Sequence, residues 1–357
     1  MWDRIITNIQ RGKIMIELKN KYIVGTHIMF YEIEMVSEHT QSLVNAINTV
    51  KNKDNITVDL FYNISEFFEK INRDEISKDD LIAKFLTLVK SVESTGCNVT
   101  YKIYDDNDKP ITMVDYRRDL NYYGCVDNDY VIWGESDALL PKEAFSTLDS
   151  IKEYANQNNI HRYVVTFALR KMWDDSWKML EHNDFTDAPF YELDDPKAIT
   201  EQSSIRYSMS VDEMNEINQR CDELDVRVLK EPQFDGSILV LSSDLLKNGV
   251  NVPRCILGHA VDDTSMMNSC KQIMGDTYVQ FIIKNILKVH NRNHLEKRNY
   301  CLQMEGDRIC TQEKGPNQRG GWYENLKHLA NVNLSTFGKS QNRFNTYEDF
   351  KNIMEKK

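Results

Sequence analysis

Short apolar runs alternate with amphipathic stretches over the first 140 residues. Runs rich in β-branched and aromatic residues predict strands, at 21–29, 56–62, 99–104 and 130–133. Apolar positions at helical spacing predict the helices between them, at 38–50, 78–92 and 113–123. This alternation predicts a parallel sheet with helices on both faces. Right-handed crossovers place the strand carboxyl ends at one edge, where such sheets bind ligands.

The pattern changes after Pro141. Further strands are expected at 161–169 and 237–241, and further helices at 144–157, 211–221 and 262–274. The segment 277–290 mixes apolar and cationic residues and suits a helix, a strand or both. Residues 170–235 are polar and irregular, which predicts an insertion. We expect an α/β domain of two halves, 1–140 and 141–300, followed by a C-terminal extension over 301–357.

Composition narrows the class of protein. Hydrophobic residues make up 41% of the 357, enough for a packed core. The seven cysteines include no CxxC pair, which argues against a zinc finger or a disulfide framework and favours reduced thiols. No apolar run is long enough for a signal peptide or a membrane span, so a cytoplasmic protein is expected. The Asn-, Lys- and Ile-rich composition suits an AT-rich genome, either bacterial or that of a virus in its host cell.

The net charge of −11 argues against a general binder of nucleic acid, although it leaves room for a local basic groove. The sequence also lacks GxSxG, Walker A and GxGxxG motifs. Their absence makes a serine hydrolase, a P-loop NTPase and a dinucleotide-binding enzyme less favoured.

The first candidate site is an acidic pair, Glu135 and Asp137, directly after the apolar run 130–133. Two carboxylates at the end of a buried strand can bind a hard divalent cation that also bridges substrate phosphates. The alternative is an acidic turn with no ligand.

A second acidic pair, Asp262 and Asp263, opens a predicted helix. One carboxylate could cap the helix while the other accepts a proton from an acceptor hydroxyl; simple capping is the alternative. A third candidate is the cationic stretch 284–298, which suits a diphosphate and contains His290 as a potential metal ligand. A solvated cationic helix face is the alternative there.

The order of these features resembles the GT-A-fold glycosyltransferases, in particular their family-2-like inverting group. The resemblance rests on YRRDLNYYGCVDNDYVIWGESDALLPKEAF (116–145), where members carry an Arg/Asn helix and a DxD-type motif. It rests also on FDGSILVLSSDLLKNGVNVPRCILGHAVDDTSMMNSC (234–270), where they carry a Gly, a strand, a short helix and an acidic pair. The stretch ILKVHNRNH supplies a late histidine. Covering roughly 21–295, the resemblance implies a Rossmann-type, mostly parallel sheet. Its first half would bind the nucleotide sugar, and its second half the acceptor.

The resemblance also implies roles for the acidic residues. Asp137 would bind a Mn²⁺ or Mg²⁺ ion, and Glu135 would contact the donor ribose or a metal-bound water. His290 would complete the metal or diphosphate site. Asp263 would be the general base, with Asp262 beside it. The family usually has Asp where this chain has Glu135, and Glu where it has Asp262.

Other residues would face the donor nucleotide. Tyr31, Glu32 and Asn63 would lie near the base, although the family often has Asp at the position of Asn63. Arg117 or Arg118 would approach the base or the diphosphate. The resemblance therefore implies a metal-dependent transfer of a sugar from a nucleotide-diphosphate donor, expected to be UDP-linked, to a hydroxyl.

Two other functions remain open: a nucleotidyltransferase of the same fold, and a non-catalytic sugar-nucleotide-binding or interaction protein. A glycan is the default acceptor. A DNA base is a less favoured acceptor and would need a basic groove in the tail, with Lys327, Lys339, Arg343 and Lys351 as first candidates.

Overall fold

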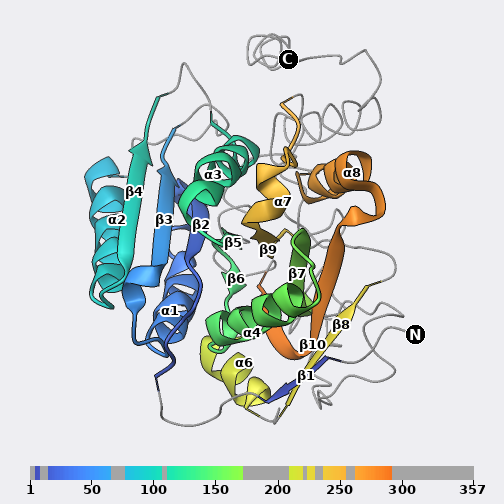
Figure 1. Cartoon of the computed structure of the whole chain (residues 1–357). Coiled ribbons are helices and arrows are strands. Elements are labelled where there is room, and N and C mark those ends of the chain that lie inside the picture. The colour runs from blue at the N-terminus through green and yellow to red at the C-terminus, as the bar shows by residue number, and fades with distance from the viewer. Residues whose placement is uncertain are drawn as a thin grey trace, which may run out of the picture.

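The computed structural model describes residues 5–8, 15–65, 77–106, 111–171, 209–219, 223–229, 236–254 and 262–291. Ten strands within these ranges form one sheet in the order β1-β8-β10-β7-β9-β5-β2-β3-β4, with β6 beside β10 (Figure 1). The strands are β1 (Ile5–Asn8), β2 (Tyr22–Met29), β3 (Ile56–Asn63), β4 (Asn98–Tyr104), β5 (Tyr130–Glu135), β6 (Ala138–Leu139), β7 (Tyr163–Lys171), β8 (Glu223–Val228), β9 (Ile238–Ser242) and β10 (Val279–His290). The α-helices are α1 (Val36–Ile47), α2 (Lys78–Glu93), α3 (Met113–Asp127), α4 (Ala144–Gln157), α6 (Val211–Asn218), α7 (Ser243–Lys247) and α8 (Asp262–Met274).

The sheet is mostly parallel, as the strand–helix alternation predicts. Strands β4, β3, β2 and β5 are parallel neighbours, and so are β7 and β10. The central strand β9 runs antiparallel to both β5 and β7, so β5 and β7 point the same way. The carboxyl ends of β2, β3, β5, β7 and β10 therefore lie at one edge. Both halves expected from the sequence contribute strands to this single sheet.

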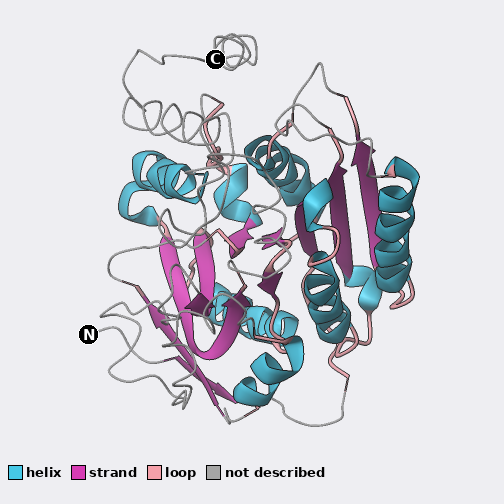
Figure 2. Ribbon diagram, turned by 180° about the vertical axis from the view of Figure 1, so that it is seen from behind, coloured by secondary structure: helices cyan, strands magenta, loops and turns pink. Residues whose placement is uncertain are grey.

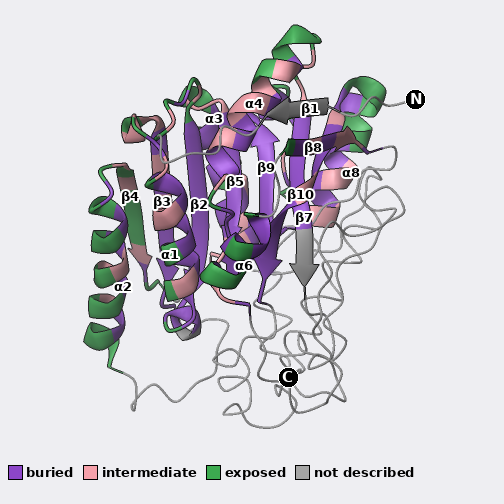
Figure 3. Ribbon diagram, turned by 90° about the horizontal axis from the view of Figure 1, so that it is seen from below, coloured by how far each residue is buried: buried purple, intermediate pink, exposed green. Residues whose placement is uncertain are grey.

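Helices cover both faces of the sheet (Figure 2). Apolar residues of α1, α2 and α4 form one core cluster with the strands, and those of α3, α7 and α8 form another on the opposite face. Strands β2 and β9 are buried along their whole length (Figure 3), which explains their near-continuous apolar sequences. Helix α6 packs on the far end of β10 through a smaller cluster.

Two segments of the second half, 223–228 and 277–290, form strands that the sequence does not clearly predict. The irregular character expected over 170–235 is wrong for 223–228, which form β8 beside β10. Only two residues of this strand, Leu224 and Val226, are buried, so the apolar signal is weak. The segment 277–290, for which helix and strand were both open, forms the long strand β10.

Strand β10 carries a register shift that decides where its end lies. Ile283 pairs with Phe167 of β7, whereas Leu287 pairs with the next residue, Ala168. The three residues between them form a bulge, anchored through Asn285 to the backbone of β8. Bulges bend a strand and re-aim its later side chains. Beyond the bulge, β10 also pairs with β6, and His290 lies opposite Ala138.

Candidate functional site

Glu135, Asp137 and His290 meet at the carboxyl edge of the sheet. The Nε2 atom of His290 lies 2.9 Å from a Glu135 oxygen and 3.2 Å from an Asp137 oxygen. All three side chains offer ligand atoms within 4.8 Å of one another. His290 and Asp137 are almost fully buried, and Glu135 is mostly buried. The structure thus brings His290 next to Glu135 and Asp137, although His290 follows Glu135 by 155 positions in the sequence.

Backbone contacts hold these side chains in place. Glu135 is the last residue of β5, and its N–H donates to the carbonyl of Ser237 at 2.9 Å. The chain turns at Asp137 into β6, which pairs with β10. The N–H of Asn291 then donates to the Asp137 carbonyl at 2.7 Å. The cluster is therefore built by the strand pairing itself and not by a flexible loop.

The electrostatics of the cluster favour a cation. Burial alone would lower the pKa of His290, but the carboxylates of Asp137 and Glu135 outweigh burial and raise it. Burial likewise would raise the pKa of Glu135, but His290 and Arg117 hold it well below its usual range. Both carboxylate and imidazolium are thus stabilised in their charged forms.

The donor set fits a divalent metal ion. The two carboxylates suit either Mn²⁺ or Mg²⁺, and the imidazole is a common ligand of divalent transition metals. The Nε2 atom of His290 lies 2.9 and 3.2 Å from the two carboxylates, so all three groups are near enough to bind one ion. Such an ion would replace the positive charge that a protonated His290 provides.

Arg117 links this cluster to the second acidic pair. Its Nη2 donates to Glu135 at 3.0 Å and to the carbonyl of Gly236 at 2.7 Å, while its Nη1 donates to Asp262. The guanidinium also stacks on Trp133, 4.7 Å from the ring centroid. Burial would lower the pKa of Arg117, but the carboxylates of Asp262 and Glu135 raise it above its usual value. The arginine is fully buried and cationic between two acids.

Asp262 and Asp263 have different surroundings at the start of α8. Asp262 is buried and bound to Arg117. Asp263 is partly exposed, and its Oδ1 accepts the N–H of the next residue, Thr264, at 2.7 Å. Gly236 packs against Asp263: a Cβ at that glycine would lie 3.4 Å from the Asp263 Cβ and 3.1 Å from Arg117 Nη1. Because Gly236 has no side chain, both Asp263 and Arg117 can approach its backbone closely.

Other residues expected around the donor are engaged with the protein itself. Arg118 donates to the carbonyls of Val252 and Pro253, both at 3.0 Å, and to Asp115. It holds the segment after α7 against α3. Its role as a donor contact stays a prediction.

Asn63 and Glu32 lie at the carboxyl edge near the ends of β3 and β2. Asn63 is buried and donates to the carbonyl of Ile111 at 2.8 Å. Glu32 accepts the N–H of Met29 at 2.9 Å and so closes the turn after β2. Tyr31 belongs to the same turn, and its side chain lies outside the described part. Contacts of all three with a nucleotide stay predictions.

Sequence reasoning missed a buried histidine that supports the acidic cluster. His39 of α1 contacts the carbonyl of Ala138 through Nδ1 at 2.6 Å and Thr26 through Nε2 at 2.9 Å. Burial lowers its pKa, which favours the neutral ring. The signal available in the sequence is a single His among the polar residues of an amphipathic helix. The sequence does not distinguish this histidine from a solvent-exposed one, because its partner Ala138 is brought near only by the pairing of β6 with β10.

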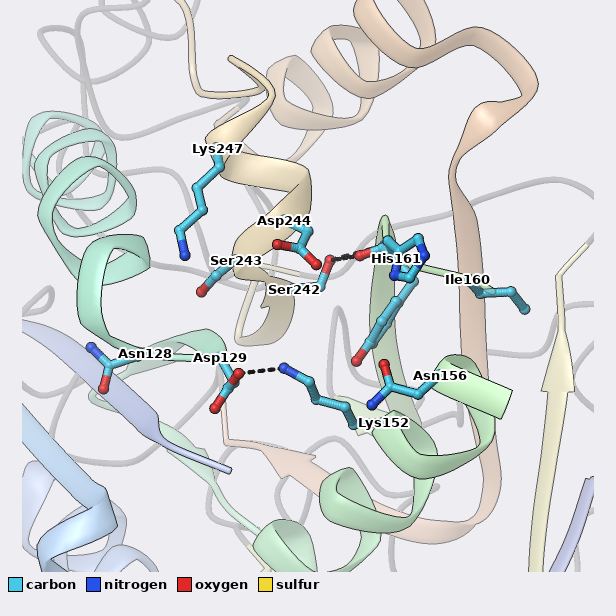
Figure 4. A pocket seen from close by; sticks show the side chains of 11 residues that line it. Asn128, Asp129, Lys152, Asn156, Ile160, His161, Ser242, Ser243, Asp244 and Lys247 are labelled. Atoms are coloured by element: carbon cyan, nitrogen blue, oxygen red, sulfur yellow. Dashed lines mark hydrogen bonds and ion pairs between the residues drawn. The ribbon is translucent and has the colours of Figure 1, made fainter. Parts of the chain in front are cut away.

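A small cavity lies at the opposite edge of the sheet, at the amino ends of β5 and β7 (Figure 4). It has a volume of about 30 Å³, and its lining includes the ion pair of Lys152 with Asp129 and the buried hydroxyl of Ser243. This volume suits one or two water molecules and not a nucleotide sugar. The carboxyl edge is therefore the better candidate for function.

No protein-family model matches the chain, and no curated protein does. Among solved structures, glucosyl-3-phosphoglycerate synthase from Mycobacterium tuberculosis, in complex with Mn²⁺, UDP-glucose and phosphoglyceric acid, is similar at 11% identity and a TM-score of 0.36. That similarity covers 76% of this chain and 72% of the other. An apo UDP-glucose pyrophosphorylase is similar at 8% identity and a TM-score of 0.33, covering 74% and 90%. The galactosyltransferase LgtC is similar at 11% identity and 0.29, covering 71% and 65%. Because these values are low, we base the function on the side chains of this chain.

Two further expectations concern other parts of the molecule. No described helix is both long and apolar enough to cross a bilayer. The basic residues Lys327, Lys339, Arg343 and Lys351, considered for a DNA groove, lie outside the described residues.

Proposed function

We propose that the protein is a divalent-metal-dependent glycosyltransferase, which moves a sugar from a nucleotide-diphosphate donor to an acceptor hydroxyl with inversion. The observation that carries this proposal is the meeting of Glu135, Asp137 and His290 at the carboxyl edge, one arginine away from the Asp262–Asp263 pair. A cation site and a separate carboxylate are the two groups that such a transfer requires.

Asp137, Glu135 and His290 would hold the ion, either Mn²⁺ or Mg²⁺. When bound, the ion would supply positive charge against the charge that develops on the leaving diphosphate. The donor would be UDP-linked, as the family resemblance implies.

Asp263 is the proposed general base. It accepts the proton of the acceptor hydroxyl while the new bond to the anomeric carbon forms and the bond to the diphosphate breaks. Asp263 suits this role better than Asp262, because Asp262 is buried and already bound to Arg117. Asp263 is partly exposed, as a group that meets an incoming acceptor must be. The proposed acceptor is a glycan hydroxyl.

A thermal-shift titration with UDP-, GDP-, CMP- and dTDP-sugars, with and without Mn²⁺, tests the donor site. A ligand present at 100 times its Kd stabilises the folded state by about 2.7 kcal/mol, which raises the Tm of a chain of this length by roughly 3–4 °C. We expect this rise with one nucleotide and only in the presence of metal. Asp137→Asn should lose it, whereas Asp54→Asn, at an exposed position far along the chain, should keep it.

The transfer step needs its own assay. Release of nucleoside diphosphate from the preferred donor, stimulated by glycan and lost in Asp263→Asn, is the expected result. Pyrophosphate release from a nucleoside triphosphate and a sugar phosphate would instead identify a nucleotidyltransferase. No metal-dependent shift with any donor would contradict the proposal and favour a non-catalytic role.

A further inference from the structure

Five charged side chains form a continuous chain across the candidate site. Asp262 contacts Arg117, Arg117 contacts Glu135 at 3.0 Å, and Glu135 contacts His290 at 2.9 Å. His290 in turn lies 3.2 Å from Asp137. Every member is mostly or fully buried, so solvent screens these contacts weakly. The chain joins the proposed ion site to the first residue of α8.

Within this row of charged side chains, Arg117 and Glu135 each interact with two partners. One oxygen of Glu135 accepts from Arg117, and the other faces His290. Arg117 divides its guanidinium between Glu135 and Asp262. A carboxylate that Arg117 grips tightly is a weaker ligand for a cation. Asp262 therefore frees Glu135 by drawing Arg117 toward itself.

We propose that Arg117 and Asp262 are positioning residues that couple ion binding at Glu135 to the placement of α8. An ion bound by Glu135 weakens that carboxylate's hold on Arg117 and strengthens the Arg117–Asp262 pair. The start of α8 is then fixed, and with it Asp263, which also packs against Gly236. This inference rests on the proposed metal site and adds an order of events: the donor-side ion organises the acceptor-side base.

Coupling between two sites is reciprocal, which provides the test. If ion binding strengthens the Arg117–Asp262 pair, then removing the charge of Asp262 must weaken ion binding, although Asp262 is no ligand. Asp276 offers a matched control, since it carries the same charge but is exposed beyond the other end of α8.

Calorimetric titration of the purified chain with Mn²⁺ measures this effect. We expect Asp262→Asn to raise the Kd for Mn²⁺ by about fivefold or more, the lower end of typical coupling. Asp276→Asn should stay within about twofold of the wild type. In an Arg117→Met background, Asp262→Asn should no longer change the Kd, because the intermediary is gone.

A second measurement needs no variant and so avoids any loss of folding. Hydrogen exchange of the α8 amides should slow by about fivefold when Mn²⁺ is added to the wild type. Unchanged α8 exchange, or equal Kd values for the two asparagine variants, would overturn the coupling and leave the proposed function intact. Absence of Mn²⁺ binding to the wild type would instead remove the metal site on which both proposals depend.

Discussion

Gly134 offers a sharp test of how the acidic edge is packed. This residue lies in β5, where the strand passes the hydrogen bond between Thr26 and His39. A Cβ at Gly134 would lie 2.8 Å from Thr26 Oγ1 and 3.1 Å from His39 Cε1. Both neighbours are buried and bound to each other at 2.9 Å, so neither moves without breaking that contact.

The expected cost of Gly134→Ala has two parts. Overpacking of a buried site costs about 1–3 kcal/mol. Weakening the Thr26–His39 hydrogen bond adds about 1 kcal/mol. We therefore expect the free energy of unfolding to fall by about 2–4 kcal/mol, measured by urea denaturation followed by circular dichroism. Because His39 also holds the carbonyl of Ala138, Mn²⁺ binding should weaken in the same variant.

A double-mutant cycle separates this contact from a general loss of stability. Thr26→Ala alone should cost about 1–3 kcal/mol, since it leaves His39 Nε2 without its partner. In the Gly134→Ala background it should cost less, because it also removes the atom that the new Cβ meets. Strictly additive costs, or a Gly134→Ala protein within about 0.5 kcal/mol of the wild type, would refute this account of the packing.

Two further predictions concern the opposite edge of the sheet. Burial alone would raise the pKa of Asp129, but its ion pair with Lys152 lowers it. The ion pair therefore stabilises the folded state above about pH 4, and this stabilisation is lost as the pH falls through the folded-state pKa of Asp129. Lys152→Met should therefore lower the free energy of unfolding by at most about 1 kcal/mol near neutral pH, because Asp129 is partly exposed. In urea denaturation from pH 3 to 7, the difference between variant and wild type should shrink as the pH falls. A difference that stays constant with pH would contradict this prediction. Tyr130→Phe removes a buried hydroxyl that donates to the carbonyl of Leu148 and pairs with Tyr163, and should lower the free energy of unfolding by about 1–3 kcal/mol. Adding Tyr163→Phe should cost less than it does alone, and equal costs in both backgrounds would show that the hydroxyls do not interact.

Local pattern predicts most of the first half of the fold. The apolar runs 56–62 and 130–133 fall within β3 and β5, and the helical spacing over 78–92 falls within α2. These elements lie in a parallel sheet covered on both faces, so their burial leaves a strong signal in the sequence. The signal fades where burial is partial or an element is short, as in β8 and the two-residue β6.

The candidate site could be predicted only in outline. The two acidic pairs and His290 are visible as residues, but their meeting depends on the pairing of β6 with β10. The sequence predicts that Arg117 or Arg118 approaches the donor. The ion pairs of Arg117 with Asp262 and Glu135 depend on how α3 and α8 pack against the sheet. Such long-range contacts follow from tertiary packing, which single-residue propensities do not encode.

The shifted register of β10 also affects how distant relatives of this chain would be found. Three extra residues stand between Ile283 and Leu287 on β10, while β7 advances by one. An alignment that crosses this point without a gap would compare His290 with a residue from the wrong position of a relative that lacks the bulge. Since strand side chains alternate between faces, an offset of three also exchanges inward and outward positions. A search for relatives should therefore anchor the histidine to its partner Ala138 across the sheet, and not to its distance along the chain from β10's first residue.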